Sequence, residues 1–191
     1  MSRNGDVTRL SYHVAALRVA FGLIWAIDAS FKWRPAFLAS YLAQVRTAAA
    51  GQPSWLLWLF HGAERLIAVD PRLFAVGTAV IESLTAFGLI FGFARRYGYL
   101  VGAGFSILVW IFAEGFGGPY TAGSTDIGTG IIYAVVFFAL FGLDRLAGPR
   151  PLSLDQVIER RWPPWGRISE AGSVRSAAGS STAPRAQGTG L

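Results

Sequence analysis

Residues 72–93 read RLFAVGTAVIESLTAFGLIFGF, an apolar run interrupted near its middle by a single carboxylate, Glu82. At a helical rise of about 1.5 Å per residue, a stretch of this length covers the roughly 30 Å of hydrocarbon in a bilayer. Arg95 and Arg96 close the run with basic charge. The segment therefore predicts a membrane-spanning helix that carries an acid about 15 Å deep.

Three further apolar stretches have the length of a span, and they cover residues 12–31, 97–113 and 127–146. The first lacks a small-residue cleavage site after its apolar run, so we interpret it as an uncleaved helix. The chain is 53% hydrophobic and only 15% charged, with a mean hydropathy of +0.43. A soluble domain of 191 residues could not bury so much apolar surface. We predict an all-α fold, an integral membrane four-helix bundle, over residues 1–147.

Residues 33–71 differ from the predicted spans. Apolar residues recur at helical spacing beside Gln44 and Arg46, which predicts an amphipathic helix. Pro53 can open a second helix, but the stretch that follows it, SWLLWLFHGAERLIAV, is too short to cross and carries tryptophans suited to headgroups. We expect two amphipathic interfacial or re-entrant helices between the first and second spans.

Residues 148–191 replace apolar periodicity with Pro, Ser, Gly, Ala and Arg. Trp162 and Trp165 lie in the stretch RWPPWGR, where they are expected to touch lipid headgroups. Beyond Ser169 the composition cannot build a core, which predicts disorder. We assign residues 148–191 as a low-complexity cytoplasmic tail.

The arginines predict the orientation. The Arg95-Arg96 loop and the tail are basic, whereas the loop at residues 114–126 has no Lys or Arg. The 33–71 insert argues in the opposite direction, since it carries Arg34 and Arg46 and, toward its end, Arg65, with Arg72 just after it. Short cytoplasmic loops of membrane proteins carry an excess of Lys and Arg. We therefore expect both termini and the Arg95-Arg96 loop on the cytoplasmic side of a bacterial-type inner membrane. The 33–71 insert and the 114–126 loop then share the outer face.

Composition also narrows the chemistry. Without cysteine the chain cannot exchange thiols or ligate an iron–sulfur cluster. His13 and His61 fall on opposite sides of the predicted topology, so no haem between them is expected, and no metal site is predicted. No nucleotide-binding fingerprint appears. The net charge of +6 comes from arginines at helix ends and in the tail, which favours membrane orientation over nucleic-acid binding.

Four acidic residues gather toward the predicted outer leaflet: Asp28, Glu82, Glu114 and Asp126. A charge inside a membrane costs at least ~2.5–3.5 kcal/mol, so it normally faces a partner or a wet cavity and marks function. We predict that Glu82 and Glu114 are catalytic and that Asp28 and Asp126 bind a ligand.

Structural roles are open for the same residues. Asp28 and Lys32 are four apart on one helix and could simply pair. Arg18 could extend to the cytoplasmic interface or pair with Glu82 across the bundle. Asp126 could cap the last span.

The loop EGFGGPYTAGSTDIG, residues 114–128, combines four glycines before Asp126 with hydroxyl side chains. The glycines allow left-handed backbone, and such backbone at membrane depth must be buried or line a cavity. Tyr120, Thr121 and Ser124 are therefore predicted to bind a polar ligand or a quinone head group. The alternative is a tight helix hairpin with no ligand.

This layout resembles the DoxX/DoxD family of four-helix membrane proteins. The resemblance rests on RVAFGLIWAIDASFKW in the first span, on the insert that follows it, and on AEGFGGPYTAGSTDIGTGIIYAVVFFAL. It covers roughly residues 12–147. DoxD-type membership implies the small membrane subunit of a thiosulfate:quinone oxidoreductase, and DoxX-type membership implies a role in thiol-oxidant defence complexes. The absence of cysteine argues against direct thiol exchange.

The leading hypothesis is a membrane subunit of a quinone-linked oxidoreductase, with quinone as cofactor and a partner subunit or a second copy as partner. A small-solute or ion transporter that uses the same carboxylates is the first alternative. The second is a membrane anchor or assembly protein for a redox complex.

Overall fold

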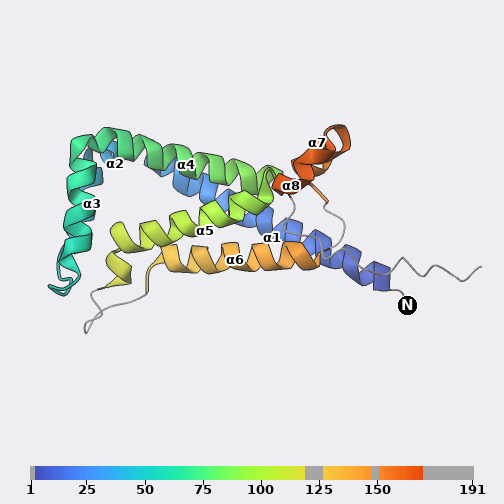
Figure 1. Cartoon of the computed structure of the whole chain (residues 1–191), viewed down its shortest axis with the longest axis horizontal. Helices are drawn as coiled ribbons and strands as arrows, with labels where there is room; N and C mark the ends of the chain where they lie inside the picture. Colours follow the sequence, from blue (N-terminus) through green and yellow to red (C-terminus); the bar gives the residue numbers. More distant parts are fainter. Residues whose placement is uncertain (1–2, 119–126, 148–150, 170–191) are drawn as a thin grey trace, which may run out of the picture.

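A computed structural model describes residues 3–118, 127–147 and 151–169. Within these ranges every regular element is helical, which confirms the all-α prediction for them (Figure 1). The longer helices are α1 (Arg3–Lys32), α2 (Pro35–Ala49), α3 (Leu57–Val69), α4 (Pro71–Phe91), α5 (Arg95–Phe112) and α6 (Thr129–Leu146). The shorter elements are the 3-10 turns η1 (Gly115–Gly117) and η2 (Pro163–Trp165) and the helices α7 (Leu154–Arg161) and α8 (Gly166–Ser169).

Three helices in the described part of the chain are long and apolar enough to cross a membrane: Val7–Lys32 within α1, α4 and α6. They coincide with the first, second and last predicted spans. Helix α5 has 18 residues but begins with Arg95 and Arg96, which lower its mean hydropathy, and it is not among them. The chain thus has three candidate membrane-spanning helices, and the four-span bundle stays a prediction.

Polarity is distributed in the opposite sense to that of a soluble protein. Ile27, Leu84 and Val135, on three different helices, are each 60–64% exposed. Arg18 and Glu82, in contrast, are each only 2% exposed. Charged side chains are almost never fully buried in water-soluble proteins unless they are paired. An apolar medium around these helices accounts for both the exposed aliphatic residues and the buried charges.

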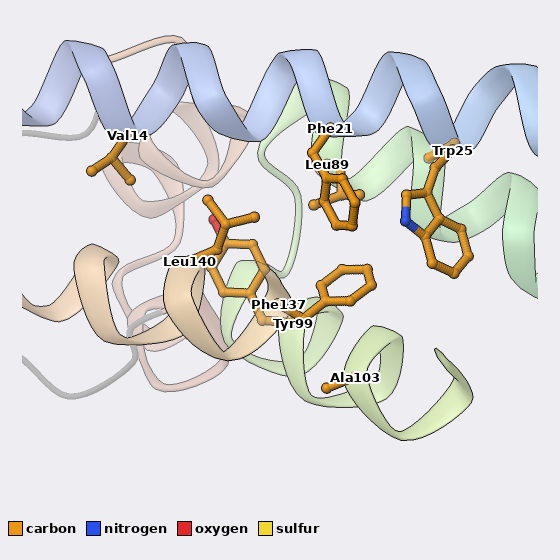
Figure 2. Close-up of a cluster of buried hydrophobic side chains, with 9 residues drawn as sticks. Val14, Phe21, Trp25, Leu89, Tyr99, Ala103, Phe137 and Leu140 are labelled. Carbon is orange, nitrogen blue, oxygen red and sulfur yellow. The ribbon is translucent and has the colours of Figure 1, made fainter. Parts of the chain in front are cut away.

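The hydrophobic core lies between two pairs of helices, since α1 packs along α4 and α5 packs along α6. Phe21 and Trp25 of α1 meet the Phe137 ring of α6 edge-on, with ring centroids 5.0 and 5.4 Å away (Figure 2). Leu89 of α4 and Tyr99 of α5 join the same cluster, so all four helices contribute to one core.

Two glycines determine how closely these helices approach. A Cβ atom at Gly22 of α1 would lie 2.9 Å from the backbone nitrogen of Ile90 on α4. A Cβ atom at Gly102 of α5 would overlap the ring of Phe137 on α6. Small residues at such positions allow the close packing that holds helices together in lipid.

The two helices of the insert, α2 and α3, are present as predicted. Helix α3 crosses the direction of the long helices at the end of the molecule where α4 begins and α5 ends (Figure 1). The Tyr41 hydroxyl lies 2.9 Å from the Thr78 hydroxyl on α4, and Gln52 donates to the carbonyl of Gly115 at 2.7 Å. The insert is therefore joined to the first half of α4 and to the η1 turn after α5, and its position at a membrane interface stays a prediction.

Replacing Gly102 by alanine should destabilise the protein because the new methyl group must displace Phe137. Overpacking of this kind costs about 1–3 kcal/mol, and the expected result is a lower melting temperature of the detergent-solubilised protein. Gly104→Ala on the same helix is the matched control, since a Cβ atom there meets nothing within 4 Å. Equal melting temperatures for the two variants would contradict the close contact between α5 and α6.

Candidate functional site

Glu82 lies near the middle of α4, on a buried stripe that also includes Thr78, Ala79, Ala86 and Leu89. The helical repeat places this stripe against α1, and Lys32 of α1 supplies the countercharge. The Lys32 Nζ atom is 3.8 Å from Glu82 Oε1. The second oxygen, Oε2, is buried without a hydrogen-bond partner in the described part of the chain. A buried carboxylate with one unused acceptor atom can take up a proton or accept a hydrogen bond from a ligand.

Asp28 shares Lys32 with Glu82. The Lys32 ammonium lies 3.4 Å from the Asp28 carboxylate, one helical turn away, and the two side chains are 22% and 38% exposed. The predicted pairing of Asp28 with Lys32 is confirmed. We call Asp28, Lys32 and Glu82 the Glu82 cluster. Its two carboxylates face one ammonium group, so the cluster with both acids ionised carries one excess negative charge.

Glu114 takes a position at the amino end of α6. Its carboxylate accepts hydrogen bonds from the Thr129 hydroxyl and from the Gly130 amide, the latter at 3.0 Å. These contacts satisfy donors that a helix leaves unpaired in its first turn, and the negative charge suits that end of the helix dipole. Glu114, predicted as catalytic, therefore has a structural role as a helix cap.

Tyr133 of α6 packs against the aromatic core. Its ring lies against the indole of Trp25, with centroids 5.7 Å apart. Trp25 Nε1 is itself buried without a hydrogen-bond partner in the described part of the chain.

The remaining predicted ligand-binding residues are Tyr120, Thr121, Ser124 and Asp126, and all four lie outside the described residues. The prediction that Asp126 caps α6 therefore also stays a prediction. Within the described residues no group of His, Asp and Glu side chains is arranged to hold a metal ion.

A second ionic site was missed by the sequence analysis, and we call it the Arg95 cluster. Arg95 is 3% exposed, and it donates through Nη1 to Asp144 of α6 at 2.9 Å and through Nε to Asp155 of α7 at 3.0 Å. Asp155 is fully buried and also accepts from the Ala94 amide at 2.7 Å and from the Trp165 indole at 2.9 Å. One feature of the sequence could have indicated this site. Asp144 lies near the end of a long apolar helix, next to Arg145, and an acid in such a helix needs a positively charged partner.

Arg18 belongs to the same end of the molecule. Its guanidinium is buried and donates to the carbonyls of Leu89, Ile90 and Leu152, the last at 2.7 Å. The predicted alternative in which Arg18 pairs with Glu82 is therefore wrong, since Glu82 uses Lys32, whereas the extension of Arg18 toward the interface stays a prediction. The α4 carbonyls that a helix end leaves without partners provide its acceptors.

Residues 151–169 form a segment that we call the C-terminal clasp. The sequence analysis separated it from the 1–147 domain, but the structure packs it against the turn between α4 and α5 (Figure 1). Ser153 donates to the Gly92 carbonyl at 2.9 Å, while Asp155 receives the Ala94 amide. Gly92 and Ala94 both have left-handed backbone, with φ of 63° and 47°. The clasp thus supplies partners to a strained turn.

A half-open apolar groove of about 230 Å³ lies between α4 and α5. Its lining runs from Ile81 and Leu84 of α4 to Phe93 and Tyr97 at the turn, and Glu82 is not part of it. The lining is mainly apolar, so the groove suits a hydrocarbon chain.

Fold and sites together define a helical protein with the features of a membrane protein and two buried ionic clusters. Comparison with family models, with curated proteins and with solved structures gives no match for this chain. The resemblance to the DoxX/DoxD family remains a prediction from the segments quoted above.

Replacing Asp155 by alanine should cost about 3–5 kcal/mol, because Arg95 would keep a buried charge with one partner lost. The expected readout is a clearly lower melting temperature and faster proteolytic removal of the clasp. Gln156→Ala, which changes the adjacent half-buried residue, is the control. Equal stability of Asp155→Ala and Gln156→Ala would show that the clasp is not held by this carboxylate.

Replacing Glu114 by alanine should destabilise the first turn of α6 by about 1 kcal/mol, the usual effect of losing a helix cap. Hydrogen exchange of the amides at residues 129–132 should accelerate, while that of α4 stays unchanged. Glu64→Ala on α3 removes a partly exposed carboxylate of the same type as a control. Unchanged exchange at the start of α6 would argue against the capping role.

Proposed function

We propose that α1, α4, α5 and α6 cross the membrane as a four-helix bundle and that this chain is a membrane subunit of a quinone-linked oxidoreductase. The proposal depends on one observation, the burial of Glu82 with a free carboxylate oxygen beside a shared Lys32. A buried ionisable residue in a membrane-embedded helix is a functional candidate because of what its burial costs.

The four-span arrangement is supported by the packing of α5. Although Arg95 makes this helix less apolar, its charge is buried and neutralised by Asp144 and Asp155. Beyond Arg96 the helix presents apolar side chains such as Val101 and Leu108, which are 57% and 52% exposed. A helix of 18 residues extends about 27 Å, close to the hydrocarbon thickness.

The orientation is supported by the position of the arginines. Arg96, Arg145, Arg160 and Arg161 belong to the end of the molecule at which α4 meets α5 and α6 ends. The opposite end carries Arg34, Arg46, Arg65 and Arg72, of which Arg46 is paired with Glu64, but the loop at residues 114–126 has no basic residue. Under the rule that basic residues stay in the cytoplasm, this end is the inner one, and the Glu82 cluster opens toward the outer half.

The chemistry required is modest. Reduction of a quinone adds two electrons and two protons to its two carbonyl oxygens. Lys32 can donate a hydrogen bond to one carbonyl, and Glu82 can relay a proton to it. Electrons would come from a reduced sulfur compound such as thiosulfate, oxidised at a partner subunit.

A transporter is the second candidate, and the charge of the Glu82 cluster favours it. Two carboxylates against one ammonium attract a cation or a proton. The aromatic core at Phe21, Trp25 and Phe137 lies between this cluster and the Arg95 cluster, so transport would require that core to open.

Glu82→Gln tests both candidates. If the protein is a quinone-linked subunit, the wild-type protein purified in mild detergent carries quinone. In the presence of the partner proteins, the rate of thiosulfate-dependent quinone reduction falls by about 10²-fold or more in the variant, as expected for the loss of an acid–base group. Glu64→Gln, on the insert, should leave the rate unchanged. Cation or proton flux into proteoliposomes that disappears in Glu82→Gln would instead favour the transporter. A wild-type protein with no quinone and no quinone reduction, even with its partners, would end the oxidoreductase proposal.

A further inference from the structure

The C-terminal clasp presents an apolar face that no other part of the described chain covers. Leu154 and Val157 are three residues apart on α7 and are 39% and 61% exposed, and Leu152 just before the helix is 70% exposed. Trp162 at the end of the helix is 52% exposed. Trp165 differs, because its indole turns inward to Asp155 and its ring lies 5.3 Å from that of Phe93. Leu154 and Val157 thus share one exposed face of α7, with exposed Leu152 just before the helix and Trp162 just after it, and Trp165 attaches the segment to Phe93.

The position of this surface is restricted by its attachments. Ser153 and Asp155, which alternate with Leu152 and Leu154, bind the turn between α4 and α5. Because that turn joins two proposed spans, α7 is held at the level where those spans leave the hydrocarbon. Exposed leucine, valine and tryptophan at this level are typical of a segment in the headgroup layer.

Charge at this end of the molecule is positive on the outside. The buried charges cancel, since Arg18 and Arg95 are balanced by Asp144 and Asp155. On α7 itself, Arg160 and Arg161 are exposed, and Glu159 accepts a hydrogen bond from Ser169. Arg160 and Arg161 directly precede Trp162, which puts basic and aromatic groups side by side. This combination is complementary to anionic phospholipid headgroups.

We propose that the C-terminal clasp binds the surface of an anionic lipid leaflet. Leu152, Leu154, Val157 and Trp162 enter the boundary between headgroups and acyl chains, and Arg160 and Arg161 bind lipid phosphates. The clasp thereby fastens the α4–α5 turn to the membrane. This inference rests on the membrane placement proposed above, but it does not depend on quinone chemistry.

The absence of cysteine makes a direct test possible, because a single introduced cysteine carries the only spin label. The full-length Val157→Cys variant is labelled and reconstituted into vesicles of phosphatidylcholine, with or without phosphatidylglycerol. Collision of the label with oxygen, which concentrates in lipid, is compared with collision with a water-soluble nickel chelate. Leu84→Cys on α4 reports the membrane placement of the bundle, and Gln156→Cys reports the neighbouring face of α7.

The expected result is a several-fold higher oxygen-to-nickel collision ratio at position 157 than at position 156, with the ratio rising further when phosphatidylglycerol is present. The double variant Arg160→Gln/Arg161→Gln should remove the dependence on the anionic lipid. A label at position 157 that meets nickel freely in anionic vesicles, while position 84 lies in hydrocarbon, would overturn the inference alone. Protection of position 157 from both reagents would also overturn it, because it would indicate a protein occupant. A label at position 84 in water would reject the membrane placement itself.

Discussion

The buried Arg95 guanidinium is the interaction on which the arrangement of the helices depends most. It binds a carboxylate of α6 and a carboxylate of the C-terminal clasp, and its own backbone amide begins α5. An unpaired charge in this position would be very costly, so α5, α6 and the clasp must come together for any of them to be stable. Asp155 also accepts a hydrogen bond from the Ala94 amide, so the same carboxylate stabilises the left-handed backbone of the turn between α4 and α5.

The two ionic clusters lie on either side of the aromatic core, and this separation gives them different characters. In the Arg95 cluster two carboxylates face Arg95, and the buried Arg18 at the same end supplies the second positive charge. In the Glu82 cluster two carboxylates share Lys32 alone, and Asp28 is partly exposed. Each cluster contains a buried atom without a hydrogen-bond partner in the described part of the chain, Nη2 of Arg95 and Oε2 of Glu82, so the charge ratio and the exposure of Asp28 are what distinguish the two.

Sequence reasoning predicted the parts of the site that depend on local spacing. Asp28 and Lys32 are one helical turn apart, so their pairing follows from helix geometry alone. The partner of Glu82 could not be predicted in this way, because it depends on how α1 and α4 are rotated against each other. The same ambiguity led to the incorrect pairing of Glu82 with Arg18. Glu114 was assigned a catalytic role from its glycine-rich surroundings, and its contact with the start of α6 depends on how α5 and α6 are placed against each other.

By itself, the sequence determined the helical class, the positions of three apolar helices and the two amphipathic helices between the first and second of them. Hydrophobic periodicity and run length carry that information, and both are properties of consecutive residues. Only the tertiary structure decided that residues 151–169 join the bundle and that Arg95 is an interior residue. Asp155 and Arg95 are 60 residues apart in the chain, and nothing in the local spacing of either one points to the other. Their ion pair can be recognised only from the folded structure, which brings both side chains together in the interior.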